Sequence, residues 1–139
     1  ITLIPPFAKP DHQAREVIEY FEAFSSPVQI FEVEIKGFGA FGTRTFFAQP
    51  ENQPLLYELY AAISDYFEDF FVGEKRSQYS FNPHMTIANR DINEEDLNEV
   101  AKEFSKKNYH AILKFKSISL FKFDGKKWQV MSKVPLLDQ

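Results

Sequence analysis

The stretch Ser80-Phe81-Asn82-Pro83-His84-Met85-Thr86-Ile87-Ala88-Asn89-Arg90 decides how the chain folds, because an extended segment starts in it and carries reactive side chains. Its proline biases the preceding residue toward extended backbone and is tolerated at the start of a strand, so we predict a strand from about His84. Side chains alternate between the faces of a strand, so His84 and Thr86 share one face, whereas Met85 and Ile87 point to the other. The pattern predicts one chemical face and one core face.

A partial second copy of this pattern opens the chain. Ile1-Thr2-Leu3-Ile4-Pro5-Pro6-Phe7 aligns with Met85-Thr86-Ile87-Ala88-Asn89-Arg90-Asp91, threonine on threonine. The position equivalent to His84 is the residue immediately before Ile1, and a chain that begins inside a predicted strand without an initiating Met is expected to be part of a longer protein. One His-x-Thr tripeptide is weak evidence of a site, but two at equivalent places indicate a duplicated one. His12 and His110 are poor substitutes, because neither is followed two residues later by Thr.

Composition limits the function classes that remain. The 139 residues correspond to one domain, and 44% hydrophobic with 26% charged residues is typical of a soluble globular protein. A net charge of -4 argues against binding long duplex nucleic acid. No stretch approaches the roughly 18 consecutive apolar residues of a membrane span. The absence of Cys excludes disulfides, thiol catalysis and thiolate metal sites, and it fits a cytoplasmic protein. Most of the 16 Phe are expected in the core.

Hydrophobic periodicity predicts an α+β protein in which each half of the chain follows the order strand, helix, strand, strand. The acidic residues of the longest helix are expected to form a solvated face rather than a metal site; they are Glu58, Asp65, Glu68 and Asp69. Glycine density between residues 37 and 42 indicates a turn or bulge. The predicted helices run from Lys9 to Ser26, from the segment Pro50 to Pro54 up to Gly73, and from Asn93 to Asn108. The predicted strands, besides Ile1 to Phe7 and the one at His84, are Val28 to Lys36, Thr43 to Gln49, Ala111 to Lys116, Ile118 to Phe123 and Trp128 to Val134.

These motifs resemble the 2H phosphoesterase superfamily, which includes the bacterial 2'-5' RNA ligases and cyclic phosphodiesterases. The resemblance rests on Pro83-His84-Met85-Thr86-Ile87 and on the opening Ile-Thr-Leu-Ile-Pro-Pro-Phe. It extends through Phe41-Gly42-Thr43-Arg44-Thr45-Phe46-Phe47 and Ser119-Leu120-Phe121-Lys122 to Trp128, and so covers nearly the whole chain. It implies a single bilobal domain over residues 1–139, in which two pseudo-symmetric halves with antiparallel sheets surround a central cleft. The strand and helix that usually precede the first motif are missing from the sequence.

The resemblance also implies a mechanism. His84 acts as acid or base, Thr86 donates a hydrogen bond to phosphate, Thr2 is the donor of the first motif, and the partner histidine precedes Ile1. Imidazoles with a pKa near 6.5 suit a reaction in which one proton is removed and another is donated. The implied activity is metal-independent hydrolysis of 2',3'-cyclic phosphates of nucleotides or RNA ends, 2'-5' RNA ligation, or both. No cofactor or metal is expected.

Further side chains are candidates for substrate binding. Arg44 and Arg90 suit phosphate contact, and Phe7, Phe41 and Tyr79 suit stacking on a base. The expected partner is a nucleotide or an RNA terminus, rather than an extended duplex or a membrane, and we expect a monomer.

Two other functions remain open at this point. The chain is an enzyme if a histidine precedes Ile1, and a non-catalytic nucleotide or phosphate binder if another residue stands there. In a third interpretation His84 is structural, and the protein is an interaction module that uses an aromatic sheet surface.

Overall fold

The computed structural model describes residues 1–71 and 80–138, so the predicted helix end at Gly73 and the stacking candidate Tyr79 lie outside the described residues. The chain divides into two compact units, which are described separately. The first unit comprises residues 1–3, 32–54 and 80–114, and the second comprises residues 4–31, 55–71 and 115–138. Each unit therefore combines segments from both halves of the sequence.

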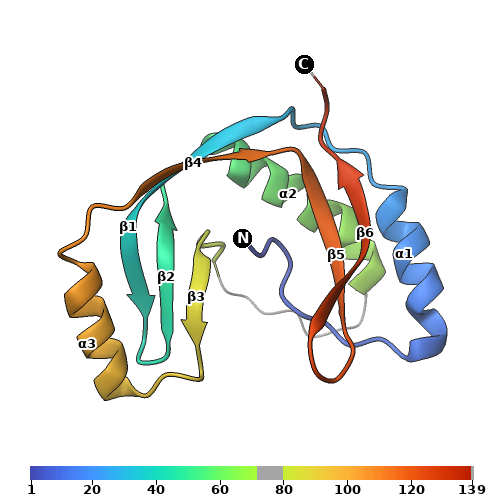
Figure 1. The fold of residues 1–139 in the computed structure, drawn as a ribbon. Coiled ribbons are helices and arrows are strands. Elements are labelled where there is room, and N and C mark those ends of the chain that lie inside the picture. The colour runs from blue at the N-terminus through green and yellow to red at the C-terminus, as the bar shows by residue number, and fades with distance from the viewer. Residues whose placement is uncertain (72–79, 139) are drawn as a thin grey trace. The chain divides into compact units, whose positions relative to one another are not determined.

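A four-stranded sheet forms the first unit, and Figure 1 shows its strand β3 beside β2. The strands are β1 (Phe31–Phe41), β2 (Thr45–Pro50), β3 (Met85–Asn89) and β4 (His110–Phe115), in the order β3-β2-β1-β4. Strand β2 pairs antiparallel with both β1 and β3. The glycine-rich segment contains the predicted bulge, because the β1 register shifts between Ile35 and Phe38, where Gly37 has a φ of 67°. The chain turns toward β2 only at Gly42, whose φ is 54°.

Helix α3 (Glu94–Phe104) covers one face of this sheet. The predicted cap is present, since the Asn93 side chain accepts a hydrogen bond of 2.8 Å from the backbone N–H of Asp96. At the other end of the helix, the Phe104 ring packs edge-on against Phe38 at 4.9 Å and against Phe46 at 5.4 Å. Phe46 is buried, so aromatic packing against α3 forms the core of this unit.

Two helices of the second unit pack through aromatic side chains. They are α1 (Ala14–Glu22), which follows the short helix η1 (Asp11–Gln13), and α2 (Pro54–Glu68), which continues into η2 (Asp69–Phe71). The Tyr20 hydroxyl donates to the Tyr66 carbonyl at 2.8 Å, and the Tyr66 hydroxyl donates to the Tyr20 carbonyl at 2.9 Å. Helix α1 ends before the predicted Ser26, because the buried Ser26 hydroxyl bonds to the backbone of Val28 and fixes a non-helical segment.

The second unit also contains an antiparallel hairpin of β5 (Ser117–Phe123) and β6 (Trp128–Pro135), beside α1 in Figure 1. Contacts between α1 and β6 cover one side of the hairpin. The predicted turn is confirmed: the Asp124 N–H donates to the Lys127 carbonyl at 3.0 Å, and Gly125 has a φ of 96°.

The predicted α+β class is confirmed, but two further local predictions, at Ile1 to Phe7 and at Ile87, are wrong. Residues Ile1 to Phe7 form no strand, because none of the described residues makes a hydrogen-bonded ladder with them. Ile87 is 54% exposed rather than core, because it is the extra residue of a bulge: Thr86 pairs with Phe47 and Ala88 with Phe46.

Two surface features complete the fold. The acidic side chains of the α2 segment lie in exposed positions, as predicted; they are Glu58, Asp65, Glu68 and Asp69. Every helix in residues 1–71 and 80–138 is too short or too polar to traverse a lipid bilayer.

Candidate functional site

The face of the first unit's sheet that α3 does not cover gathers the candidate residues, and we call it the open face. Two cross-strand rows define it. Gly39 lies opposite Phe47, which lies opposite Thr86, and Phe41 lies opposite Thr45, which lies opposite Asn89. Opposite residues of paired strands point to the same side of a sheet, so these rows project together. The open face consists of Gly39, Phe41, Thr45, Phe47, Thr86 and Asn89, with His84 just before β3.

His84 lies at the start of the edge strand with its ring held by a backbone carbonyl. Its Nδ1 lies 2.8 Å from the carbonyl oxygen of Asn82. A carbonyl oxygen only accepts hydrogen bonds, so the proton of the neutral ring is on Nδ1. This leaves the lone pair of Nε2 available: Nε2 is a base in the neutral ring and an acid in the imidazolium.

Two phenylalanine rings flank the imidazole. Phe41 lies 5.0 Å from the His84 ring centroid at an interplanar angle of 89°, and Phe47 lies 5.5 Å away at 61°. Phe41 and Phe47 also contact one another at 4.4 Å. Gly39 makes room for this cluster, because a Cβ at that position would lie only 2.6 Å from the Phe47 ring. The aromatic cluster therefore fixes the imidazole from the sheet side.

The structure places the two threonines in the same unit as His84. Thr86 shares the open face with His84, because His84 contacts Phe47, the cross-strand partner of Thr86. The Thr86 side chain is exposed, as is that of Thr2, which belongs to the first unit through residues 1–3. A hydroxyl on an exposed strand position is accessible to a ligand oxygen.

The candidate arginines lie together at the far end of the same ladder. The Arg90 N–H donates to the Arg44 carbonyl at 3.1 Å, and both side chains are exposed. Arg90 follows His84 by six residues, up to roughly 20 Å of extended chain, and its φ of 63° turns the backbone as β3 ends. The structure thus brings the backbones of the two arginines together, but at the opposite end of β3 from the His84 ring.

The stacking candidates have different positions. Phe41 lies beside His84, as described above. Phe7 belongs to the second unit, where its ring packs edge-on against Phe71 at 4.8 Å and Phe70 at 6.5 Å. Of the three candidates, Phe41 is the one that the described structure brings to the histidine.

The other histidines have surroundings unlike those of His84. His12 is exposed in η1 of the second unit. His110 lies on β4, at the opposite edge of the sheet from β3, where its Nε2 is 3.2 Å from a Glu34 carboxylate oxygen. Lys36 bridges Glu34 at 3.2 Å and Glu51 at 3.1 Å. Lys36 and then His110 lower the pKa of Glu34, and Glu51 followed by Glu34 raises the pKa of Lys36, so this is an exposed ion-pair network.

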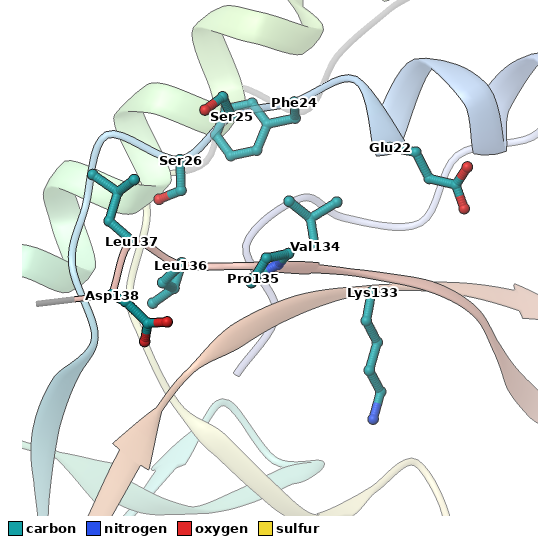
Figure 2. Close-up of a pocket in the computed structure, with 10 residues that line it drawn as sticks. All are labelled: Glu22, Phe24, Ser25, Ser26, Lys133, Val134, Pro135, Leu136, Leu137 and Asp138. Carbon is teal, nitrogen blue, oxygen red and sulfur yellow. The ribbon is translucent and has the colours of Figure 1, made fainter.

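Figure 2 shows a groove in the second unit that contains none of the predicted site residues. Its volume is about 400 Å³. It lies between the end of β6 and the segment after α1, and Lys133 extends away from the other lining side chains. The groove brings no imidazole to its charged groups. Among the described residues, no group of three His, Asp or Glu side chains is arranged to hold a metal ion.

Several residues of the open face carry no signal in the sequence. Phe47 and Gly39 matter through cross-strand contacts, which depend on the strand register. Asn89 likewise matters through a cross-strand contact, because its side-chain carbonyl accepts a 3.0 Å hydrogen bond from the Thr45 hydroxyl. With its carbonyl engaged, the Asn89 amide group remains a donor on the same face of the sheet as Thr86.

Comparison with known proteins identifies the family. The chain resembles TT0787 of Thermus thermophilus in fold, with a TM-score of 0.57 and 19% sequence identity over 93% of this chain and 73% of that one. No curated protein matches the sequence. A sequence model of the 2'-5' RNA ligase superfamily matches residues 1–127, nearly the whole chain. The chain therefore belongs to the 2'-5' RNA ligase superfamily, which confirms the resemblance seen in its sequence.

Proposed function

We propose that the protein is a phosphoesterase of the 2H type that hydrolyses 2',3'-cyclic phosphates of nucleotides or RNA ends, or runs the reverse step as a 2'-5' RNA ligase. The observation that carries the proposal is the hydrogen bond from His84 Nδ1 to the Asn82 carbonyl, which leaves Nε2 free for proton transfer. Membership of the superfamily supports a phosphoesterase or ligase role.

The proposed reaction needs two proton transfers. A base takes a proton from water as the water oxygen attacks phosphorus, the bond from phosphorus to one ribose oxygen breaks, and an acid protonates that oxygen. His84 Nε2 supplies one of these roles. We assign the other role, from the resemblance to the family and the alignment of Thr2 with Thr86, to a second imidazole one residue before Ile1.

The remaining polar groups suit the negative charge that accumulates on the phosphate. A Thr86 hydroxyl two residues after His84 and on the same face is a donor for a non-bridging oxygen. The Asn89 amide, oriented by Thr45, is a second donor on that face. Phe41, which is 42% exposed beside the imidazole, is a surface on which a base can stack.

The test is turnover of 2',3'-cyclic nucleotides in excess chelator by the protein with its upstream residue in place. His84→Ala should lower the rate by roughly 10²- to 10⁴-fold, the range for a lost acid-base group. His110→Ala is the matched control, because it removes an imidazole from the same sheet at the opposite edge, and it should retain the rate.

Three outcomes would change the proposal. Equal loss of rate in both histidine variants would mean that the effect is structural. Loss of all turnover in chelator would point to a metal-dependent reaction. No turnover by a folded protein that still binds a cyclic nucleotide, with affinity weakened by His84→Ala, would favour the non-catalytic nucleotide binder.

A further inference from the structure

One side of the β5–β6 hairpin is aromatic and exposed, and we call it the hairpin face. Its cross-strand pairs are Phe121 with Val130 and Phe123 with Trp128, and these four side chains are between 48% and 53% exposed. Most other Phe of the chain are at least partly buried. A contiguous group of large, exposed apolar side chains often marks an interaction surface. The described residues leave this face open for a partner.

The helices cover the opposite side of the hairpin. Lys122 lies between the two Phe residues of the hairpin face and donates to Asp11 of η1 at 2.8 Å. Ser132 on β6 donates to Glu22 of α1 at 2.6 Å. Side chains alternate along a strand, so the two Phe residues point away from the side on which Lys122 makes its contact. The hairpin face is thus supported from behind by η1 and α1.

The turn holds the tip of the hairpin in one geometry. The Asp124 carboxylate accepts hydrogen bonds of 2.8 Å from the backbone N–H groups of Lys126 and Lys127, and the side chain of Gln129 donates to its other oxygen. The two aromatic rings nearest the turn contact one another at 5.3 Å. The acidic side chain of the hairpin is therefore engaged within the turn, and the rings at the tip are in place before a partner binds.

The hairpin is basic in an acidic protein. Residues 116–135 contain five Lys and a single acidic residue, which gives a net charge of +4. The whole chain has a net charge of -4, so the remainder carries -8. Lys126 and Lys127 lie at the turn, and Lys133 projects on the side of the hairpin face, because its partner on β5 lies two residues before Phe121. An anionic surface is therefore attracted by the hairpin and repelled by the rest of the chain.

The size of the hairpin face narrows the choice of partner. Its two aromatic pairs span about 7 Å along the strands and about 5 Å across them. A large aromatic side chain has roughly 150 to 250 Å² of surface, so four half-exposed side chains offer on the order of 400 Å². Stable protein interfaces bury roughly 800 Å² per partner, and their cores are depleted in Lys. The hairpin face is too small and too basic for a protein interface of ordinary size.

A lipid surface requires less area. Trp and other aromatic side chains settle at the boundary between headgroups and acyl chains, and each Lys near the surface adds attraction to anionic lipids. The hairpin places both kinds of side chain at one end, with Phe123 and Trp128 beside the turn and Lys126 and Lys127 in it. The long Lys side chains reach the headgroups while the rings lie deeper. The tip therefore has the chemistry of an anchor for anionic lipid surfaces.

We propose that the β5–β6 hairpin binds reversibly to membrane surfaces that contain anionic lipids, with its aromatic rings at the acyl boundary and Lys126, Lys127 and Lys133 against the headgroups. Attachment of this kind goes beyond the proposed catalytic activity. It also departs from the expectation that the protein has no membrane partner, which rested on the lack of a long apolar stretch. Surface binding needs only a few exposed side chains.

Trp128 allows a direct test, because it is the only Trp of the chain. Vesicles of phosphatidylcholine with phosphatidylserine should shift its fluorescence to shorter wavelength as the indole leaves water, and vesicles of phosphatidylcholine alone should shift it far less. Co-sedimentation with the same vesicles gives the affinity. Phe123→Ala should weaken binding by roughly 3- to 13-fold, the range for loss of a half-buried aromatic side chain. Ile112→Ala is the matched control, because it removes a similarly exposed apolar side chain from β4 and should leave the affinity unchanged.

The lysines are tested separately. Lys127→Gln should weaken binding to the anionic vesicles by roughly 5-fold, the contribution of one Lys near such a surface. Lys106→Gln, just after α3, changes the net charge of the chain equally and should retain the affinity. Added salt should weaken binding, because it screens the attraction. Turnover of a soluble cyclic nucleotide should be unchanged in Phe123→Ala and Lys127→Gln, which separates membrane attachment from the proposed activity.

The proposal is overturned if anionic vesicles leave the Trp128 fluorescence unchanged, or if Phe123→Ala binds them like Ile112→Ala. Equal weakening by Lys127→Gln and Lys106→Gln would also contradict it, because net charge rather than the hairpin would then drive binding. A shift that follows protein concentration without vesicles would indicate self-association through this face instead. The same shift with soluble glycerophosphoserine or a 2',3'-cyclic nucleotide would mean that the face binds a small ligand and not a surface.

Discussion

Substitution of Gly39 by Ala tests whether the aromatic cluster positions His84. The added Cβ would lie 2.6 Å from Cζ and 2.7 Å from Cε2 of Phe47, whereas carbon atoms pack at about 3.5 to 4.0 Å. The Phe47 ring must therefore move by about 1 Å. Because Phe47 contacts both Phe41 and His84, the displacement reaches the imidazole.

The stability change has two opposing parts. Overpacking of a buried ring costs about 1 to 3 kcal/mol. Replacing a strand Gly by Ala restores about 0.4 to 1 kcal/mol by restricting the unfolded chain. We expect a net loss of roughly 0.5 to 2 kcal/mol in the free energy of unfolding, measured by denaturant titration, and a shift of the His84 ring resonances in the NMR spectrum.

A double variant supplies the control. Phe47→Leu removes the part of the ring that the new methyl would meet, so the stability losses of Gly39→Ala and Phe47→Leu should not add. Turnover of a cyclic nucleotide should fall about 10²-fold in Gly39→Ala, because a displacement of about 1 Å disturbs proton transfer. The reasoning is refuted if Gly39→Ala leaves both the His84 resonances and the free energy of unfolding unchanged, or if the two substitutions are additive.

Three further predictions follow from other contacts. Asn93→Ala should lower the free energy of unfolding by about 1 kcal/mol in denaturant titration, because it removes the cap of α3, and Asn93→Asp should retain most of it. The pKa of Asp124 is lowered from its ordinary value of 3.8 by backbone hydrogen bonds from Lys127 and Lys126 and by one from the Gln129 side chain. The ionised carboxylate therefore stabilises the fold at pH values above 3.8, and this stabilisation is lost as the pH falls through the lowered pKa. Thermal unfolding should show Asp124→Asn less stable than the parent protein at neutral pH, with a difference that shrinks in acid; a constant difference would contradict this. Thr86→Val should reduce cyclic nucleotide turnover by roughly 10- to 10³-fold through loss of one phosphate donor, whereas Thr86→Ser should retain it.

The sequence was sufficient for the elements whose signals are local. Asn93 followed by three acidic residues predicted the start of α3, and Asp124-Gly125 predicted the hairpin turn, because both depend on hydrogen bonds within a few residues. The motif around His84 predicted both the position of β3 and the family, because the proline and the alternation of side chains act over the same short range.

Features that depend on strand register could not be predicted. Alternation assigned Ile87 to the core, but the bulge that exposes it arises from pairing with Phe46 and Phe47, about forty residues earlier in the chain. The aromatic cluster at His84 was missed for the same reason, because Gly39 and Phe47 meet only across β1 and β2. The predicted core role of the Phe residues fails at Phe121 and Phe123, where the helices cover the opposite side of the hairpin.

The most direct test of the account is the tautomer of His84, read from the ¹⁵N chemical shifts of its imidazole by NMR at a pH where the ring is neutral. The central claim is that the Asn82 carbonyl holds the proton on Nδ1 and leaves Nε2 for proton transfer. The account predicts a protonated Nδ1 and an unprotonated Nε2, and Asn82→Ala should preserve that state because the acceptor is backbone. A neutral ring with its proton on Nε2 would contradict the claim and remove His84 as the base.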